Sequence, residues 1–219
     1  MLDRKPKNMS HNRAEHSDIK PENNARAKKN TREKRERRPP KKITSTYLHN
    51  SGLYYLERFA ASKKHFKTVM MRKVKRSCMH HKDQDYNECA VLVDELVNKF
   101  EKSGLLNDDL YTNGSVASLR RKGLSRMAII SKMLQKGIAK DQTVLALEKL
   151  DYETHESGDD AEHAAALNFA RKKRIGPYFR GDEQNIKKSL GVLARGGFSY
   201  SVAMSILEMN AEDVDMTMY

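Results

Sequence analysis

Two cysteines and two neighbouring histidines are the side chains in this sequence best suited to metal binding. Cys78, His80 and His81 stand close together, and Cys89 follows them across a polar loop. Structural zinc sites usually offer two close pairs of ligands at characteristic spacing, whereas here one compact group faces a lone cysteine. The pattern favours two free thiols over a zinc site, so we expect neither a bound metal nor a cofactor.

Acidic pairs are the second group that suits chemistry. Asp108-Asp109 and Asp159-Asp160 each stand where a helix is expected to begin. Carboxylates there complement the positive end of the helix dipole, which favours a stabilising role over metal binding or acid–base catalysis. The chain also lacks a phosphate-binding glycine loop, a nucleophile elbow and a His-Glu-x-x-His motif. We therefore expect a protein that is not an enzyme.

Basic residues are the most conspicuous chemistry that remains. The run from Lys63 to Arg76 holds seven Lys and Arg residues and no acid, with apolar residues at helical spacing between them. Arg120-Arg121-Lys122 with Arg126, and the run from Arg171 to Arg174, add two further clusters. Such a run is as often a solvated face as a contact surface for nucleic acid or an acidic partner. Three clusters spread along the chain favour a long anionic or polar partner.

The distribution of charge separates a basic arm from the body. The 219-residue chain carries a formal net charge of +13, and residues 1–42 hold 15 basic against 6 acidic residues, which leaves only +4 for the rest. The arm offers too little apolar surface to offset the entropy of ordering it, so we expect it to be disordered. It lacks the apolar core of a signal peptide, and no apolar run is long enough to span a bilayer. These features favour a cytoplasmic protein.

The body reads as helices separated by glycine turns. Val93, Leu96, Val97 and Phe100 fall on one helical face, and no segment alternates as a strand does. Four times a run ends in Gly followed by an apolar residue, and a capping residue then opens the next run. These turns are Gly104-Leu105 before Asn107, Gly123-Leu124 before Ser125, Gly137-Ile138 before Asp141, and Gly197-Phe198 before Ser199.

Comparison of the chain with itself indicates an internal repeat. Shifted by 74 residues, Gly123 and Ser125 fall on Gly197 and Ser199, and a fainter copy 63 residues upstream places Ser62 on Ser125. Helix pairs that repeat are typical of stacked arrays. The sequence therefore predicts three helical units, with an insertion near 175–182. The predicted parts are a basic arm at 1–46, helical units near 47–103, 105–152 and 160–210, and an acidic tail at 211–219.

Four stretches of the body resemble the RecX family, and its alphaproteobacterial branch in particular. They are, in order, YLERFAAS at 55–62 with Arg72-Lys73-Val74 after it, RRKGLSRMAIISKMLQKGI at 120–138, ALNFARKKRIGP at 166–177, and LARGGFSYSVAMSIL at 193–207. The resemblance covers roughly residues 47–208. Gly196 departs from it, because the family commonly has a second Arg before this Gly-Phe.

The resemblance implies an all-α, curved and elongated array of tandem three-helix repeats. It also implies a monomeric regulator that lies in the groove of a RecA filament on single-stranded DNA. Family members damp the recombinase, ATPase and coprotease activities of RecA, and the resemblance leaves direct contact with DNA open. Because basic residues cluster around the Gly123 turn and along the run from Lys63 to Arg76, we expect the filament surface to include Arg120, Arg121, Lys122, Arg126, Lys132, Lys136, Lys63, Lys67, Arg72 and Arg195.

A rival interpretation is a DNA-binding protein that uses its glycine-turned helix pairs as helix-turn-helix units. The run that begins at Ser125 offers Arg126, Lys132, Gln135 and Lys136 as candidate base-reading side chains. A preference for particular DNA sequences would favour this rival, since a regulator of RecA filaments needs none.

Overall fold

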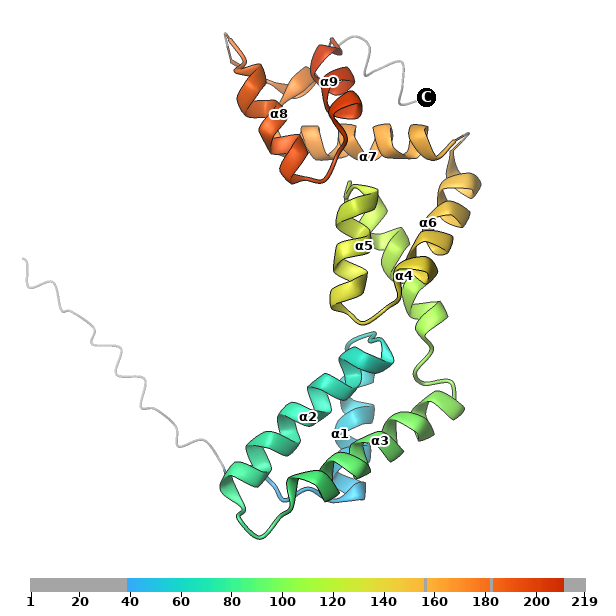
Figure 1. Ribbon diagram of the computed structural model, residues 1–219, viewed down its shortest axis with the longest axis vertical. Coiled ribbons are helices and arrows are strands. Elements are labelled where there is room, and N and C mark those ends of the chain that lie inside the picture. Colours follow the sequence, from blue (N-terminus) through green and yellow to red (C-terminus); the bar gives the residue numbers. More distant parts are fainter. Residues whose placement is uncertain (1–38, 156, 182, 211–219) are drawn as a thin grey trace, which may run out of the picture. The chain divides into compact units, whose positions relative to one another are not determined.

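The computed structural model describes residues 39–155, 157–181 and 183–210. Across these ranges the chain forms nine α-helices and one short 3-10 helix, without a strand (Figure 1). The predicted all-helical fold is confirmed. None of the helices in these ranges has both the length and the apolar character needed to cross a membrane. Residues 1–38 of the predicted arm and the predicted tail 211–219 lie outside the described residues.

The first three helices enclose a core centred on two phenylalanines. Helix α1 spans Ser45–Leu56, α2 spans Lys63–His80 and α3 spans Tyr86–Lys102. Phe66 and Phe100 are fully buried, and their ring centroids lie 5.6 Å apart. Helix α1 passes close to both rings because Gly52 has no side chain: a Cβ there would lie 2.8 Å from the Phe100 ring.

The segment just before α1 packs against this core. Ile43 is buried, and its backbone N–H and C=O both bond the side-chain amide of Gln84, each at 2.9 Å. The Ser77 hydroxyl donates to the carbonyl of Lys41 at 2.9 Å. Residues 39–46, which the sequence assigns to the basic arm, therefore lie within the compact unit that begins at Pro39.

The next three helices form a second apolar cluster. Helix α4 spans Asp108–Arg121, α5 spans Arg126–Gln135 and α6 spans Lys140–Thr154. Val116, Ile129, Met133 and Leu147 are buried between them. The amphipathic spacing of α5 places Ile129 and Met133, four residues apart, on this inner face, while Lys132 points to the exposed side.

The last helices form a third cluster that is built largely on alanine. Helix α7 spans Gly158–Lys173, the 3-10 helix η1 spans Gly176–Tyr178, α8 spans Ile186–Arg195 and α9 spans Tyr200–Glu208. Ala165, Ala166 and Ala170 let α7 lie close to α9, whose Ile206 is fully buried. Helix η1 lies where the sequence predicts an insertion. The division of the chain into three units, with the boundaries given above, remains a proposal.

The glycine turns have the predicted conformation. Gly104, Gly123, Gly137 and Gly197 all have positive φ, between 73° and 85°. After three of them the apolar residue donates its N–H to the carbonyl five residues back, which is the Schellman pattern: Leu124 to Leu119, Ile138 to Met133 and Phe198 to Leu193.

The predicted helix caps are right at three of the four turns. Asn107, Ser125 and Ser199 are N-caps whose side chains accept from the first turn of the next helix. The prediction is wrong for Asp141, since α6 begins after Ala139 without a side-chain cap and Asp141 lies within the first turn. There its carboxylate faces the positive end of the helix rather than closing it.

Two buried capping serines connect neighbouring helix groups. The Ser62 hydroxyl, at the start of α2, donates to the carbonyl of Lys136 at the end of α5. The Ser125 hydroxyl, at the start of α5, donates to the carbonyl of Gly196 at the end of α8, 2.7 Å away. Each hydroxyl also accepts the N–H of its own helix, at 3.2 and 3.1 Å. In both bonds the start of one helix meets the end of the helix three further along the chain, α2 with α5 and α5 with α8.

The 74-residue shift and these bonds pair the helices differently. The 74-residue shift superimposes the α4–α5 turn on the α8–α9 turn, so it would match α5 with α9 instead of α8. The two turns resemble each other because both use a left-handed Gly and a Ser cap, and this local chemistry serves at more than one place in the series. The 63-residue shift, which places Ser62 on Ser125, agrees with the hydrogen bonds.

Candidate partner-binding surface

Arg120 is buried, and its guanidinium group is bonded to acidic side chains within the fold. Its guanidinium donates to both carboxylate oxygens of Asp151, at 3.0 and 2.8 Å, and to Glu162 at 2.5 Å. Only 7% of its side chain is exposed. These contacts join α4, α6 and α7, so Arg120 holds the helices together and is not available to a partner. Its place in the predicted filament surface is therefore wrong.

Three other predicted cations, of which Lys63 and Arg126 are half-buried and Lys67 is exposed, already have acidic partners. Lys63 lies 2.7 Å from Glu101, and Arg126 lies 2.7 Å from Glu148. Lys67 pairs with Asp94. Ion pairs of this kind at a surface contribute about 0–1 kcal/mol, so a partner can displace them at small cost. The carboxylates nevertheless reduce the local positive potential, which makes these three weaker candidates.

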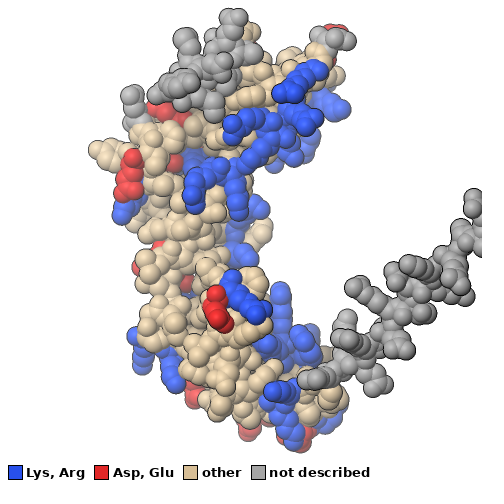
Figure 2. Space-filling view, turned by 180° about the vertical axis from the view of Figure 1, so that it is seen from behind, with Lys and Arg blue, Asp and Glu red and all other residues tan. Residues whose placement is uncertain are grey.

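The remaining predicted cations have no acidic partner among the residues that the structure describes. Five of them are exposed, on α2, α4, α5 and α8 and at the α4–α5 turn: Arg72, Arg121, Lys122, Lys132 and Arg195. The sixth, Lys136 at the end of α5, is half-buried. Figure 2 shows Lys and Arg side chains gathered along one side of the described helices, on the right in that view, where few acidic side chains are visible.

Helix α2 and the end of α5 bring two of these cations, Arg72 and Lys136, near one histidine. Burial lowers the pKa of His65 below 6.5, and the positive charges of Lys136 and Arg72 lower it further. Lys64 lies against Gly137 at the same junction, where a Cβ on the glycine would lie 2.5 Å from the Lys64 Cβ. Cations from segments far apart in the sequence therefore converge here, and their charges disfavour the protonated form of the imidazole.

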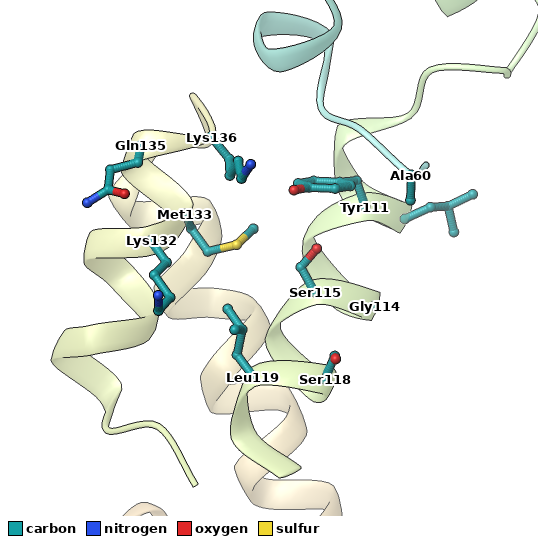
Figure 3. Close-up of a pocket in the computed structure, with 11 residues that line it drawn as sticks. Ala60, Tyr111, Gly114, Ser115, Ser118, Leu119, Lys132, Met133, Gln135 and Lys136 are labelled. Carbon is teal, nitrogen blue, oxygen red and sulfur yellow. The ribbon is translucent and has the colours of Figure 1, made fainter. Parts of the chain in front are cut away.

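A pocket of about 490 Å³ opens between α4 and α5, next to these cations. Figure 3 shows Tyr111, Ser115 and Leu119 of α4 facing Lys132, Met133 and Lys136 of α5 across it. Leu110, which also lines the pocket, is 70% exposed. The arrangement combines an apolar floor with a basic rim, and such a pocket suits an apolar side chain that is flanked by acidic ones.

The cysteines are free thiols, and they lie at the α2–α3 packing. Cys78 is half-buried and Cys89 is buried. Burial, with the neighbouring Cys78 thiol, raises the pKa of Cys89 to about 11, so its thiol stays protonated at neutral pH. No group of three or more potential metal ligands occurs among the described residues. The acidic pairs lie in the first turns of α4 and α7, as predicted.

Sequence reasoning missed the pocket. Its α4 wall is formed by small side chains at helical spacing, Gly114, Ser115 and Ser118, which leave a hollow beside Leu119. That spacing is visible in the sequence, but it becomes a signal only when a neighbouring helix is known to lie opposite. The acidic partners of the cations were also invisible, because they come from other helices.

Comparison with known proteins by sequence finds relatives that share one description. The regulatory protein RecX of Myxococcus xanthus is 38% identical over 182 residues, which cover 81% of this chain and 94% of that protein. The regulatory protein RecX of Agrobacterium fabrum is 28% identical over 172 residues, or 78% of this chain and 86% of that protein. No protein-family model matches the chain.

Two solved structures share the fold. The crystal structure of RecX from Lactobacillus salivarius matches with a TM-score of 0.52 and 21% identity, over 78% of this chain and 97% of that one. A second RecX crystal structure matches with a TM-score of 0.51 and 18% identity, over 75% of this chain and 72% of that one.

Over the described residues, the fold and the surface define a helical protein built from successive helix groups, with cations along one side that have no acidic partner there. The sequence identity to relatives of nearly full length makes the assignment more specific. The chain belongs to the RecX family of regulatory proteins.

Proposed function

We propose that this protein binds the RecA recombinase filament and modulates it, mainly by restraining its recombinase, ATPase and coprotease activities. Membership of the RecX family supports a regulatory role. The observation that carries the proposal is the set of unpaired cations beside the apolar pocket, on α2, α4 and α5. A long protein–nucleic acid filament offers anionic and apolar contacts at repeated intervals, which such a surface can match.

The contact surface that we propose is smaller than the sequence predicted. It comprises the cations that lack acidic partners, namely Arg72, Arg121, Lys122, Lys132, Lys136 and Arg195, with Lys63, Lys67 and Arg126 at its margin. Arg120 is removed because it is buried among acidic side chains. An apolar side chain of the filament would enter the pocket between α4 and α5.

A charge reversal tests this surface. Replacing Arg121, Lys122 and Lys132 with Glu substitutes repulsion for attraction and should weaken filament binding roughly tenfold to a hundredfold. The matched control replaces Lys82, Lys102 and Lys149 with Glu. These lysines are also exposed, so the control changes the net charge of the protein by the same amount. Binding is measured by co-sedimentation with RecA filaments on single-stranded DNA, and regulation by the RecA ATPase rate.

The outcomes separate a specific surface from general electrostatics. The surface variant should fold normally and lose suppression of the ATPase, while the control variant keeps it. Equal loss in both variants would show that only net charge matters. Normal suppression by the surface variant would exclude this surface and make the rest of α2, from Lys63 to Arg76, the better candidate.

The remaining parts of the proposal follow from the same family assignment. We propose a cytoplasmic, monomeric protein that is not an enzyme, and we retain the alphaproteobacterial branch as a proposal. The Myxococcus relative does not favour that branch, although the Agrobacterium relative does. The helix-turn-helix alternative predicts a preference among duplex DNA sequences, which binding to a panel of unrelated duplexes would reveal.

A further inference from the structure

Three arginines line one small pocket at the end of α7. Arg171 and Arg174 come from the last turn of that helix and its end, and Arg180 follows η1. The pocket has a volume of about 290 Å³, and its other walls are Pro177, Tyr178 and Phe179. It belongs to neither the predicted filament surface nor the pocket between α4 and α5.

Arg174 occupies a backbone conformation that usually selects glycine. Its φ is 55°, and it is the one non-glycine residue with positive φ in the described part of the chain. The turns after α3, α4, α5 and α8 place Gly in this region. A side chain there costs roughly 1–2 kcal/mol, and such strained residues are concentrated at functional sites. The guanidinium is therefore kept at this helix end in spite of a backbone cost.

The three guanidinium groups have no acidic partner among the described residues. Arg171 donates to the amide oxygen of Asn168 at 3.0 Å. The intervening lysines point elsewhere: Lys172 donates to the carbonyl of Lys122 at 2.6 Å, and Lys173 lies over the Phe169 ring. Residues 168–181 contain no acid at all. Three like charges around one pocket repel one another, so a bound anion would stabilise them.

An aromatic ring stands beside these charges. Phe179 is 38% exposed, and its N–H donates to the carbonyl of Gly176 at 3.0 Å, which holds its backbone at the end of η1. One edge of the ring packs on Gly181, where a Cβ would lie 2.6 Å from it. Guanidinium groups match phosphate oxygens in geometry, and an exposed ring offers a surface on which a base stacks.

We propose that this pocket binds a nucleotide unit, with the phosphate on the three guanidinium groups and the base against Phe179. The unit comes either from a single-stranded nucleic acid or from a free nucleotide, which share this chemistry. The proposal goes beyond regulation of RecA, and its test contains no RecA, so it stands or fails independently of the proposed partner.

Protection from an arginine-specific reagent tests the pocket on the full chain. Phenylglyoxal modification is mapped by mass spectrometry without ligand and with an oligothymidylate, thymidine monophosphate, inorganic phosphate or oligoglutamate. We expect a nucleotide ligand to protect Arg171, Arg174 and Arg180, while Arg76 on α2, also exposed, serves as the internal control. Because protection is read at each arginine, charge elsewhere in the chain does not contribute.

Each pattern of protection has one interpretation. Protection by the oligonucleotide alone supports a unit within a nucleic acid, and protection by the monophosphate as well supports a free nucleotide. Absence of protection by either would overturn the proposal. Equal protection by inorganic phosphate would overturn the stacking part, and equal protection by oligoglutamate would replace the nucleotide with an acidic peptide.

Two substitutions separate binding from folding. Arg174→Gly relaxes the backbone, so the melting temperature should hold or rise while affinity for the oligonucleotide falls roughly three- to tenfold. Arg76→Gln removes the same charge from α2 and should change affinity less. Phe179→Leu should weaken binding roughly five- to hundredfold, and Phe179→Tyr should restore it. Unchanged affinity in Arg174→Gly would contradict the site.

Discussion

At the scale of single residues, Arg120 lies at the centre of a buried polar network. Its guanidinium bonds Asp151 of α6 and Glu162 of α7, and the same Glu162 also accepts the backbone N–H of Arg126. A buried ion pair need not stabilise a fold relative to apolar residues, but removal of one partner leaves buried charge without compensation. Arg120 thus fixes how three helices meet.

The first prediction concerns this arginine. Arg120→Ala should lower the free energy of unfolding by about 3–5 kcal/mol, because Asp151 and Glu162 then remain buried without a cation. Denaturant unfolding followed by circular dichroism measures the loss. Arg121→Ala, one residue along and exposed, is the control and should change stability by less than about 0.5 kcal/mol. Similar values for the two variants would show that the buried pair contributes little.

A second prediction concerns His65 and pH. Its pKa in the fold lies below 6.5 because of burial and the charges of Lys136 and Arg72, so the unfolded chain binds the proton more tightly. Stability should therefore fall as the pH drops below 6.5 and through the lower, folded pKa, and it should be insensitive to this group above 6.5. His65→Gln should flatten that part of the profile. If the melting temperature of the variant fell with pH as steeply as that of the wild type, His65 would not be the group responsible.

At the scale of elements, the junctions between helix groups depend on capping residues that serve two helices at once. Ser125 is fully buried, caps α5 and donates to Gly196 at the end of α8. Ser199 caps α9 in the same way but is exposed, and its hydroxyl bonds only within its own turn. The pair therefore separates the local contribution of a cap from the contribution of the junction.

The third prediction uses this pair of serines. Ser199→Ala should cost about 1 kcal/mol, the usual value for a lost N-cap. Ser125→Ala should cost about 1–3 kcal/mol more, because the carbonyl of Gly196 loses its donor as well. Both values come from denaturant unfolding, with circular dichroism to verify that helix content is kept. Equal costs would mean that the bond across the junction adds nothing.

Local chemistry explains which elements could be predicted. The turns at Gly104, Gly123, Gly137 and Gly197 were predictable because left-handed glycine and a following cap are properties of a few consecutive residues. Asp141 was misassigned because Ala139 opens α6 without a cap, and a carboxylate is equally favourable within the first turn. The internal repeat stays a prediction, because similar turns of Gly and Ser occur both at the α4–α5 and at the α8–α9 junction.

At the scale of the whole molecule, residues that lie side by side in space are often far apart in the sequence. This limits what the sequence reveals about the surface. The all-helical fold follows from periodicity and turns, and it was predicted. Arg120, however, looks like its neighbours Arg121 and Lys122 in the sequence, and it differs only because Asp151 and Glu162 lie 31 and 42 residues further along. The pocket between α4 and α5 was likewise beyond reach, since it exists only when Leu119 and Met133 face each other.

The compact unit starts at Pro39. Two N-terminal deletions, one ending before this unit and one reaching into it, therefore separate the contributions of these residues to stability. Residues 1–38 are rich in charge and poor in apolar side chains, so their removal should leave the melting temperature nearly unchanged. Removal of residues 1–44 also deletes buried Ile43, its two bonds to Gln84 and the Thr44 cap of α1.

The longer deletion should therefore be clearly destabilising, whereas the shorter one should not. Loss of a buried isoleucine costs about 2–5 kcal/mol, and each kcal/mol lowers the melting temperature of a protein of this size by roughly 2–4 °C. Thermal unfolding of both truncated chains beside the full chain measures the difference. A fall of several degrees on removal of residues 1–38 alone would show that these residues stabilise the body. Equal melting temperatures for the two deletions would mean that buried Ile43 and its bonds to Gln84 contribute nothing to stability.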